Sequence, residues 1–157
     1  HVQDCMNIAN LITNHKKVVV DFGSGSGLPS VIVALCNPLN TVIAIESKER
    51  KRAFLTLVKE KMDLQNYEVH QGDIQSFRSQ YTGNIDVITA KAFAKIPKVI
   101  RHANQFNLKG KHVIIPISRA QYDDLDDKMR AFTTSVSKDG TIYYYVHCPS
   151  NVNIARS

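Results

Sequence analysis

Apolar residues recur along the chain in two alternating patterns, short β-branched runs and longer stretches with helical spacing. An unbroken β-branched run is typical of a buried strand, whereas an apolar residue every three or four positions marks one face of a helix. Helical spacing at Val2, Met6, Ala9 and Ile12 comes first. Strands are then predicted at 17–22, 41–46, 67–71, 84–90, 111–117, 141–148 and 152–155, and helices at 28–35, 48–64, 74–79, 96–106 and 120–132.

This alternation predicts an α/β fold of the Rossmann-like kind. Helical crossovers between successive strands make the strands parallel and place helices on both faces of the sheet. We therefore expect a seven-stranded, mostly parallel sheet with an antiparallel hairpin at its edge, in a single domain over residues 1–157. Pro116 has no amide donor and is expected near the end of its strand. Ligands of such sheets bind beyond the carboxyl ends of the strands, which directs attention to the loops found there.

Two expectations concern the core. Phe54, Leu55, Val58 and Met62 have the spacing of one helix face and are expected on the buried side of the helix at 48–64. The three cysteines are odd in number and form no CxxC pair, which disfavours a disulfide framework and a zinc site. Cys36 and Cys148 lie in apolar runs, so we expect them in the core of a protein from a reducing compartment.

The net charge of the chain indicates a polyanionic partner. Lys and Arg number 20 against 14 acidic residues, a net charge of +6. A basic excess favours nucleic acid because phosphate neutralisation releases counterions; a solvated basic surface is the alternative. No apolar run approaches the roughly 20 residues of a bilayer span, and no signal peptide is visible, so we expect a cytoplasmic protein without membrane contact.

The loop after the first strand has the composition of a ligand-binding turn. It reads Asp21-Phe22-Gly23-Ser24-Gly25-Ser26-Gly27-Leu28-Pro29. Glycine permits positive φ and a close approach of a ligand to the backbone. The dinucleotide fingerprint is G-x-G-x-x-G, whereas here the third glycine comes one residue early, a spacing that resembles the nucleoside-binding loop of class I methyltransferases. A tight strand–helix turn is the alternative.

Two acidic residues follow the next strands. Glu46 ends the second strand, where a carboxylate can accept both ribose hydroxyls, although a solvated strand end would look the same. Asp73 follows the third strand, at the place where this fold class holds adenine, and is an equally good N-cap for the next helix. Together with the glycine loop, these residues predict a nucleoside cofactor. No Walker A, HExxH or GxSxG pattern occurs, and the six histidines have no ligand spacing, so we expect no metal.

Further motifs occur in a fixed order along the chain. They are His1-Val2-Gln3-Asp4-Cys5, then Leu28-Pro29 after the third glycine, then Glu46-Ser47 with Lys51-Arg52-Ala53-Phe54-Leu55, and finally Ala90-Lys91-Ala92-Phe93-Ala94. They resemble H-I-x-D-S, the glycine loop with its proline, E-S with K-R-x-x-F-L, and S-R-A-F-A of the bacterial small-subunit rRNA guanine-N7 methyltransferases, the RsmG or glucose-inhibited division protein B family. The resemblance covers nearly the whole chain.

The resemblance implies transfer of a methyl group from S-adenosylmethionine to N7 of a guanine in small-subunit ribosomal RNA, by a monomer. With the glycine loop and the two acids, it gives these candidate cofactor-binding residues: Asp21, Gly23, Ser24, Gly25, Gly27, Leu28, Glu46, Asp73, Ile74, Gln75 and Lys91. Guanine N7 has an exposed lone pair, so the reaction requires alignment and no general base. The candidate catalytic residues, Lys91 and Arg119, are therefore predicted to contact RNA phosphate or the base edge without moving protons.

Basic residues near the strand ends are expected to face the RNA as a collar; for its first four members a solvated helix start is the alternative. The collar comprises Lys48, Arg50, Lys51, Arg52, Lys91, Lys95, Lys98 and Arg101. The chain also departs from the family. Ser30 stands where glycine is usual, Lys91 where arginine is usual, and Pro116 where a lysine is usual, with Arg119 the nearest replacement. The family's N-terminal helical region has no counterpart, and we expect that an upstream segment is missing.

Three other functions stay open at this point. The glycine loop and Glu46 also suit the adenosine ribose of an NAD-dependent oxidoreductase, against which stands the spacing of the glycines. The changes at Lys91 and Pro116 suit a non-catalytic RNA-binding protein of the same fold. A methyltransferase of small molecules is the third possibility, and the basic surface disfavours it.

Overall fold

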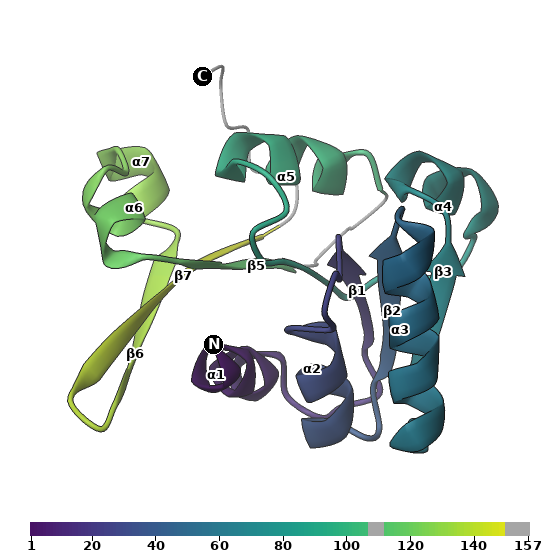
Figure 1. Cartoon of the computed structure of the whole chain (residues 1–157). Helices are drawn as coiled ribbons and strands as arrows, with labels where there is room; N and C mark the ends of the chain where they lie inside the picture. Colours follow the sequence, from purple (N-terminus) through teal and green to yellow (C-terminus); the bar gives the residue numbers. More distant parts are fainter. Residues whose placement is uncertain (107–111, 150–157) are drawn as a thin grey trace.

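The computed structural model describes residues 1–106 and 112–149. Helices and strands alternate through these residues (Figure 1). In chain order they are α1 (Val2–Ile12), β1 (Val18–Phe22), α2 (Ser30–Cys36), β2 (Thr41–Glu46), α3 (Glu49–Lys61), β3 (Tyr67–Gln71), α4 (Ile74–Gln80), β4 (Val87–Ala90), α5 (Ile96–Asn104), β5 (His112–Ile117), α6 (Arg119–Asp123), α7 (Asp127–Arg130), β6 (Thr133–Lys138) and β7 (Thr141–Pro149). None of the helices in this part of the chain is long and apolar enough to cross a membrane.

The strands form one seven-stranded sheet in the order β3-β2-β1-β4-β5-β7-β6. Strands β1 to β5 are parallel, and β7 runs antiparallel to both β5 and β6. The expected α/β fold with an antiparallel edge hairpin is confirmed. Chain order reverses between β1 and β4, which are hydrogen-bonded neighbours, so a crevice opens at their carboxyl ends.

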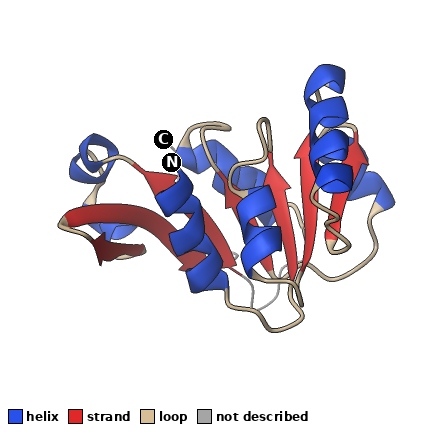
Figure 2. Cartoon of the chain, turned by 60° about the horizontal axis from the view of Figure 1, so that its bottom comes forward, coloured by secondary structure: helices blue, strands red, loops and turns tan. Residues whose placement is uncertain are grey.

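Helices cover both faces of the sheet (Figure 2). Side chains of α1, α2 and α3, such as Ile8, Val33 and Leu55, pack with one set of strand residues. Side chains of α4 and α5, such as Phe77 and Val99, pack with the other set. Each inner strand is apolar on both faces because both faces are covered, and this burial holds the strand ends in fixed positions around the crevice.

The region after β5 differs from the prediction of one helix over 120–132. It forms two short helices, capped by the side chains of Ser118 and Asp126. Arg130 Nη2 donates to the carbonyl oxygens of Tyr122 and Asp123 at the end of α6 and of Leu125 in the turn before α7. These bonds supply the partners that a continuous helix would otherwise provide to its own backbone, so the chain breaks here without leaving carbonyl groups unsatisfied.

The edge hairpin also differs from its prediction. Its strands are β6 and β7, so the strand at 141–148 is confirmed and the hairpin partner lies before it. The predicted strand at 152–155 lies outside the described residues. Strand β6 reads TTSVSK, with one apolar residue, and therefore has a weak strand pattern. Asp139 and Gly140, both at positive φ, form the turn, and Asp-Gly is a strong hairpin signal.

Two expectations about the core are wrong in part, although Val58 packs against the core as expected. On α3 only Leu55 is fully buried, while Phe54 is 48% exposed and Met62 46% exposed. Helix α3 covers β2 and β3 near the edge of the sheet, where only a narrow strip of its surface is in contact. Cys36, at the end of α2, is exposed, whereas Cys148 is buried as expected.

Candidate cofactor and acceptor site

The glycine loop leaves β1 at the crevice with all three glycines at positive φ: +66° at Gly23, +54° at Gly25 and +89° at Gly27. Two of them also have no room for a side chain. A methyl group on Gly23 would stand 2.5 Å from the Phe93 ring, and one on Gly27 would stand 2.6 Å from Val31. Glycine is therefore required here by both backbone conformation and close packing.

Asp21 lies beneath this loop and is only 1% exposed. Its carboxylate accepts hydrogen bonds from Ser24 Oγ and Thr89 Oγ1, each at 2.7 Å. Burial raises the pKa of Asp21 to about 6, against the lowering effect of the two hydroxyls. Since Ser24 is also buried, Asp21 and Ser24 tie the loop to β4 from below, and neither lines the cavities described next.

Glu46 joins the loops after β1 and β2. It is 5% exposed, its Oε2 accepts from the Gly25 amide at 2.8 Å, and its Oε1 accepts from the Lys48 amide at 2.9 Å. Each carboxylate oxygen has a further lone pair. The carboxylate is therefore fixed at the carboxyl end of β2, next to the glycine loop, which is the position that ribose recognition requires.

A cavity of about 170 Å³ opens beside these loops. It is lined by Gly23, Ile45, Ser47, Asp73, Ile74, Gln75, Phe93, Lys98 and His102. The structure thus brings together Gly23, Asp73, Ile74 and Gln75 of the predicted set. Asp73 also caps α4, because its Oδ1 accepts from the Ser76 amide at 2.9 Å, so the capping interpretation is confirmed.

His102, one of the six histidines without ligand spacing, lies in the wall of this cavity. Its Nδ1 is buried and has no hydrogen-bond partner among the described residues. Burial and the charges of Lys98 and Arg101 lower the pKa of this imidazole. A buried polar atom without a partner is uncommon, and in a cavity wall it offers a hydrogen bond to a ligand. The basic, apolar pattern of α5 contains no signal that would have set His102 apart.

A second cavity, of about 320 Å³, lies on the other side of the segment from Lys91 to Ala94. It is lined by His1, Asp4, Lys91, Ala92, Ala94, Ile96, Ile115, Pro116, Ile117, Ser118 and Gln121. Lys91 Nζ lies 3.1 Å from Nδ1 of His1. Lys91 therefore faces this cavity, while Phe93, two residues on, faces the first one.

The remaining predicted residues lie elsewhere. Gly25, Gly27 and Leu28 belong to the loop but line neither cavity. Arg119 lines neither cavity, since its guanidinium is bound to the Asp123 carboxylate and the Tyr144 hydroxyl. Its neighbours Ser118 and Gln121 do line the second cavity, so Arg119 lies at the rim.

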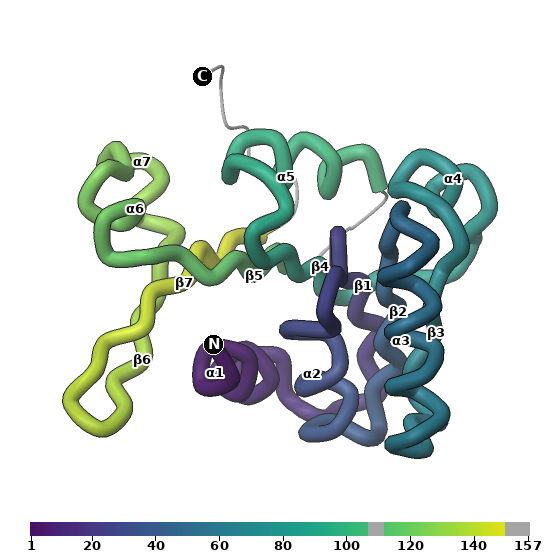
Figure 3. Tube along the Cα trace, in the orientation of Figure 1, coloured from purple at the N-terminus to yellow at the C-terminus, as the bar shows by residue number. Residues whose placement is uncertain are grey.

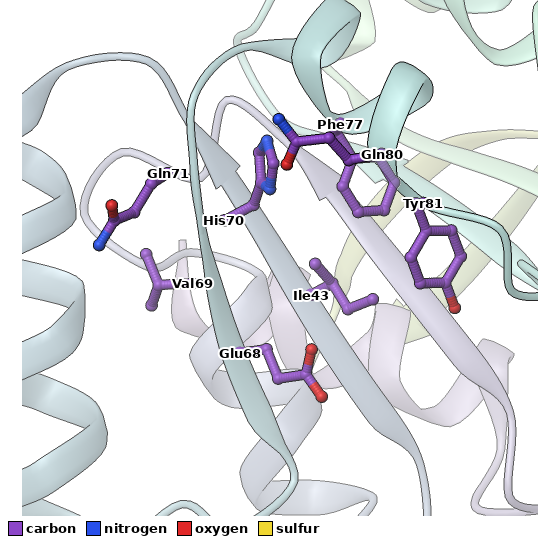
Figure 4. Close-up of a pocket in the computed structure, with 8 residues that line it drawn as sticks. All are labelled: Ile43, Glu68, Val69, His70, Gln71, Phe77, Gln80 and Tyr81. Atoms are coloured by element: carbon purple, nitrogen blue, oxygen red, sulfur yellow. The ribbon is translucent and has the colours of Figure 1, made fainter.

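A third cavity, of about 280 Å³, contains none of the predicted residues. It lies between β3 and α4 and is shown in Figure 4, with His70 and Glu68 on the strand and Phe77 and Tyr81 on the helix. The rings of Phe77 and Tyr81 are stacked with their centres 4.8 Å apart. It shares no lining residue with either of the other two cavities.

The collar has free charges. Within residues 1–106 and 112–149, none of its side chains forms an ion pair with another described residue. Lys98 lines the first cavity, and Lys51 Nζ would lie 4.0 Å from a methyl group on Gly25. Arg52 differs from the others because its guanidinium donates to the carbonyl oxygens of Glu46 and Ser47.

A parallel sheet with an antiparallel hairpin, a G-x-G-x-G loop at the switch point and an acid at the end of β2 define the class I methyltransferase fold. Solved structures agree. The METTL16 methyltransferase domain matches with a TM-score of 0.71 and 11% identity over 93% of this chain and 81% of that one. A putative methyltransferase of Escherichia coli, yhhF, matches with a TM-score of 0.67 and 13% identity, covering 96% and 88%.

Within this class, the chain belongs to the rRNA small subunit methyltransferase G family, GidB, whose model matches residues 1–150. The ribosomal RNA small subunit methyltransferase G of Orientia tsutsugamushi (strain Ikeda) is 32% identical over 123 residues, 78% of this chain and 59% of that protein. The protein of that name from Campylobacter hominis is 26% identical over 146 residues, 88% of this chain and 78% of the relative. The chain thus spans little more than half of the Orientia relative.

Proposed function

We propose that this protein transfers the methyl group of S-adenosylmethionine to N7 of a guanine in small-subunit ribosomal RNA. The observation that carries the proposal is the pair of cavities on either side of the Lys91 to Ala94 segment, at the end of the glycine loop. One suits a nucleoside and the other suits an acceptor base. Membership of the methyltransferase G family supports the same reaction.

The first cavity fits the adenosine part of the cofactor. Ile45, Ile74 and Phe93 give it apolar walls for a base, and the unpartnered Nδ1 of His102 offers a hydrogen bond. Glu46, whose carboxylate is bound to the glycine loop, would accept from the ribose hydroxyls. When bound, the cofactor supplies an electrophilic methyl group on a sulfonium.

The second cavity fits the acceptor guanine. Its walls are apolar at Ile96, Ile115 and Pro116, as a flat base requires, and Lys91 contributes a positive charge. Attack by the N7 lone pair releases no proton in the transfer step, so the residues here need only hold the base in line with the methyl group. Lys91 is then an orienting cation, and the reaction requires no proton transfer to His1 or Asp4, the two other titratable residues of the lining.

The collar supports RNA as the acceptor. Lys98 of the collar lines the first cavity and Lys91 lines the second, and the chain carries a net charge of +6. Each phosphate contact that such cations make adds about 0.9 to the slope of log affinity against log salt for duplex, and about 0.7 for single strands. We propose that the protein acts as a monomer on ribosomal RNA or the small subunit in the cytoplasm.

The first experiment is a calorimetric titration with S-adenosylmethionine. Gly25→Ala should abolish or greatly weaken binding, because Gly25 donates to Glu46 and adopts positive φ. Gly140→Ala is the matched control, since Gly140 also has positive φ but lies in the distant β6–β7 turn with open space around it. No binding by the wild type, or equal binding by both variants, contradicts the proposed cofactor site.

The second experiment measures transfer of a tritiated methyl group to small ribosomal subunits and to their naked RNA, followed by mapping of the methylated nucleotide. Modification at N7 of one guanine is expected. Cofactor binding without transfer to either substrate would favour a non-catalytic protein of the same fold. This alternative is suggested by the departures from the family pattern at Lys91 and Pro116.

A further inference from the structure

Four side chains beside the acceptor cavity form a column. The rings of Tyr122 and Tyr144 are stacked, with centroids 4.4 Å apart and planes 26° from parallel. Arg130 Cζ lies 5.3 Å from the centre of the Tyr122 ring, and Arg119 Cζ lies 5.7 Å from the centre of the Tyr144 ring. The order is therefore Arg130, Tyr122, Tyr144, Arg119.

The two ends of the column differ. Arg130 is held on the inside by its bonds to three carbonyl oxygens, two at the end of α6 and one in the turn before α7. Arg119 is the outer end, with a side chain that is 69% exposed. Its Nε lies 3.1 Å from both carboxylate oxygens of Asp123, and its Nη1 donates to the Tyr144 hydroxyl at 3.1 Å. The guanidinium is thus fixed in orientation while most of its surface faces solvent.

The position of Arg119 links it to the acceptor cavity. It is the first residue of α6, directly after β5, and the residues on both sides of it in the helix turn, Ser118 and Gln121, line that cavity. A polynucleotide whose guanine enters the cavity must pass this rim. A neighbouring nucleotide then comes within reach of Arg119.

The charges around Arg119 indicate whether its guanidinium binds a phosphate or a nucleobase. Its positive charge is already paired with Asp123, and residues 119–130 carry four aspartates against the three cations Arg119, Lys128 and Arg130. This local excess of carboxylates opposes a phosphate. The face of a nucleobase is uncharged and stacks well on a guanidinium plane.

We propose that Arg119 is a stacking platform for the base of a nucleotide next to the acceptor guanine. The inference rests on the proposed function, and it makes Arg119 a positioning residue, in place of the catalytic role expected from the sequence. The stack on Tyr144 and the bonds to Asp123 orient the guanidinium before the RNA arrives, which lowers the entropic cost of the contact.

The test compares Arg119→Lys with the wild type on a synthetic RNA that spans the guanine methylated by the wild-type protein. Lysine keeps the charge and loses the plane. Binding followed by fluorescence anisotropy should weaken about tenfold, the usual order for loss of one stacked base, with an unchanged salt slope and unchanged kcat at saturating RNA. Arg78→Lys is the control, because Arg78 is exposed on α4, at the opposite end of the sheet from α6 (Figure 3).

A second measurement uses the same RNA with an abasic residue at each position flanking the guanine. At one position the abasic RNA should bind the wild type about tenfold more weakly and should cause no further loss with Arg119→Lys. Additive losses at every position overturn the platform. So does full affinity of Arg119→Lys together with a reduced salt slope of Arg119→Gln, the result expected for a phosphate contact.

Failure of the platform and failure of the proposed function give different results. If the wild type methylates the RNA and Arg119→Lys behaves as wild type in binding, the platform alone is rejected. If the wild type binds cofactor but neither binds nor methylates any small-subunit RNA, the proposed function is rejected and the platform with it.

Discussion

The ring of Phe93 lies against the α-carbon of Gly23, so closely that a methyl group on Gly23 would be 2.5 Å from Phe93 Cδ2. The loop after β4 therefore closes directly onto the loop after β1, and both residues line the cavity proposed for adenosine. Phe93 is held there by Phe22 and His102, whose ring centres are 6.0 and 6.1 Å away.

This contact predicts the effect of Gly23→Ala. The added methyl group must displace Phe93. The alanine must also adopt a positive φ, which costs about 1 kcal/mol on its own. We expect at least a tenfold loss of cofactor affinity in calorimetry and a lower free energy of unfolding in urea. Adding Phe93→Ala should remove the clash but leave the φ strain in place. The double variant should therefore recover a part of the stability that Gly23→Ala loses. Additive losses in the double variant would show that the two residues do not interact.

Glu46→Gln should weaken cofactor binding by about tenfold or more. The carboxylate accepts from two backbone amides, whereas a glutamine has one accepting oxygen and would present its NH₂ group to the other amide. Bonds to a charged acceptor contribute about 1.5–3 kcal/mol each, so the loop should also lose stability. Glu49→Gln, an exposed change at the start of α3, is the control. Equal affinity of both variants would remove Glu46 from the cofactor site.

His102→Phe should weaken cofactor binding about fivefold while it leaves the stability of the free protein nearly unchanged. The variant removes a buried nitrogen that has no partner in the described structure, so a lost internal bond cannot account for the effect. His15→Phe, at an exposed position far along the chain, is the control for a surface imidazole. Unchanged affinity of His102→Phe in calorimetry would contradict a role in binding.

The pH dependence of stability should change in Asp21→Asn. Burial raises the pKa of Asp21 from the ordinary 3.8 to about 6 in the folded state. As pH rises through this window, the unfolded chain loses the proton first, so unfolding becomes more favourable. The shift of roughly 2 units corresponds to about 3 kcal/mol, present below pH 4 and lost by pH 6.

Urea titrations between pH 4 and 7 provide the measurement. Between pH 4 and 6 the wild type should lose stability relative to Asp21→Asn, whose side chain can still accept from Thr89 and donate to Ser24. Parallel profiles of the two proteins would mean that Asp21 is ionised at the ordinary pH in the folded protein.

One cysteine should react quickly with a thiol reagent in the native protein. Cys36 is exposed, whereas Cys5 and Cys148 are buried, and burial raises the pKa of each to about 11. Reaction needs an accessible thiolate, so only the exposed Cys36 should react with the reagent before unfolding. Ellman's reagent should therefore count one fast thiol, which Cys36→Ser removes. A fast thiol that persists in this variant contradicts the burial of Cys5 and Cys148.

The parallel part of the fold was predictable because strands buried on both faces are continuous apolar runs. Strand β2, TVIAIE, is such a run, with five of its six residues buried. Strand β6 was not predicted, because half-exposed edge strands need few apolar residues and TTSVSK has one. A strand before residue 139 is instead indicated by the apolar pattern of its partner β7 and by the Asp139-Gly140 hairpin turn.

The candidate site was predictable to the extent that loops after parallel strands meet. Asp73 and Gly23 come from distant parts of the chain and line one cavity for that reason. The direction of a side chain depends on tertiary neighbours, which spacing does not contain. Lys91 faces the second cavity, and Arg119 is held by Asp123 on its own helix and by Tyr144 on β7, so neither orientation follows from sequence position.

The segment from Lys91 to Ala94 is a wall with a different cavity on each side. Lys91 lines one cavity and Phe93 the other, so a substitution that shifts the backbone of these few residues alters the shape of both cavities. A backbone change here that adapts the protein to a new acceptor therefore also changes how the methyl donor fits its cavity. Divergence toward a new acceptor is easier at the opposite rim, in α6 and the hairpin, where the donor is not touched.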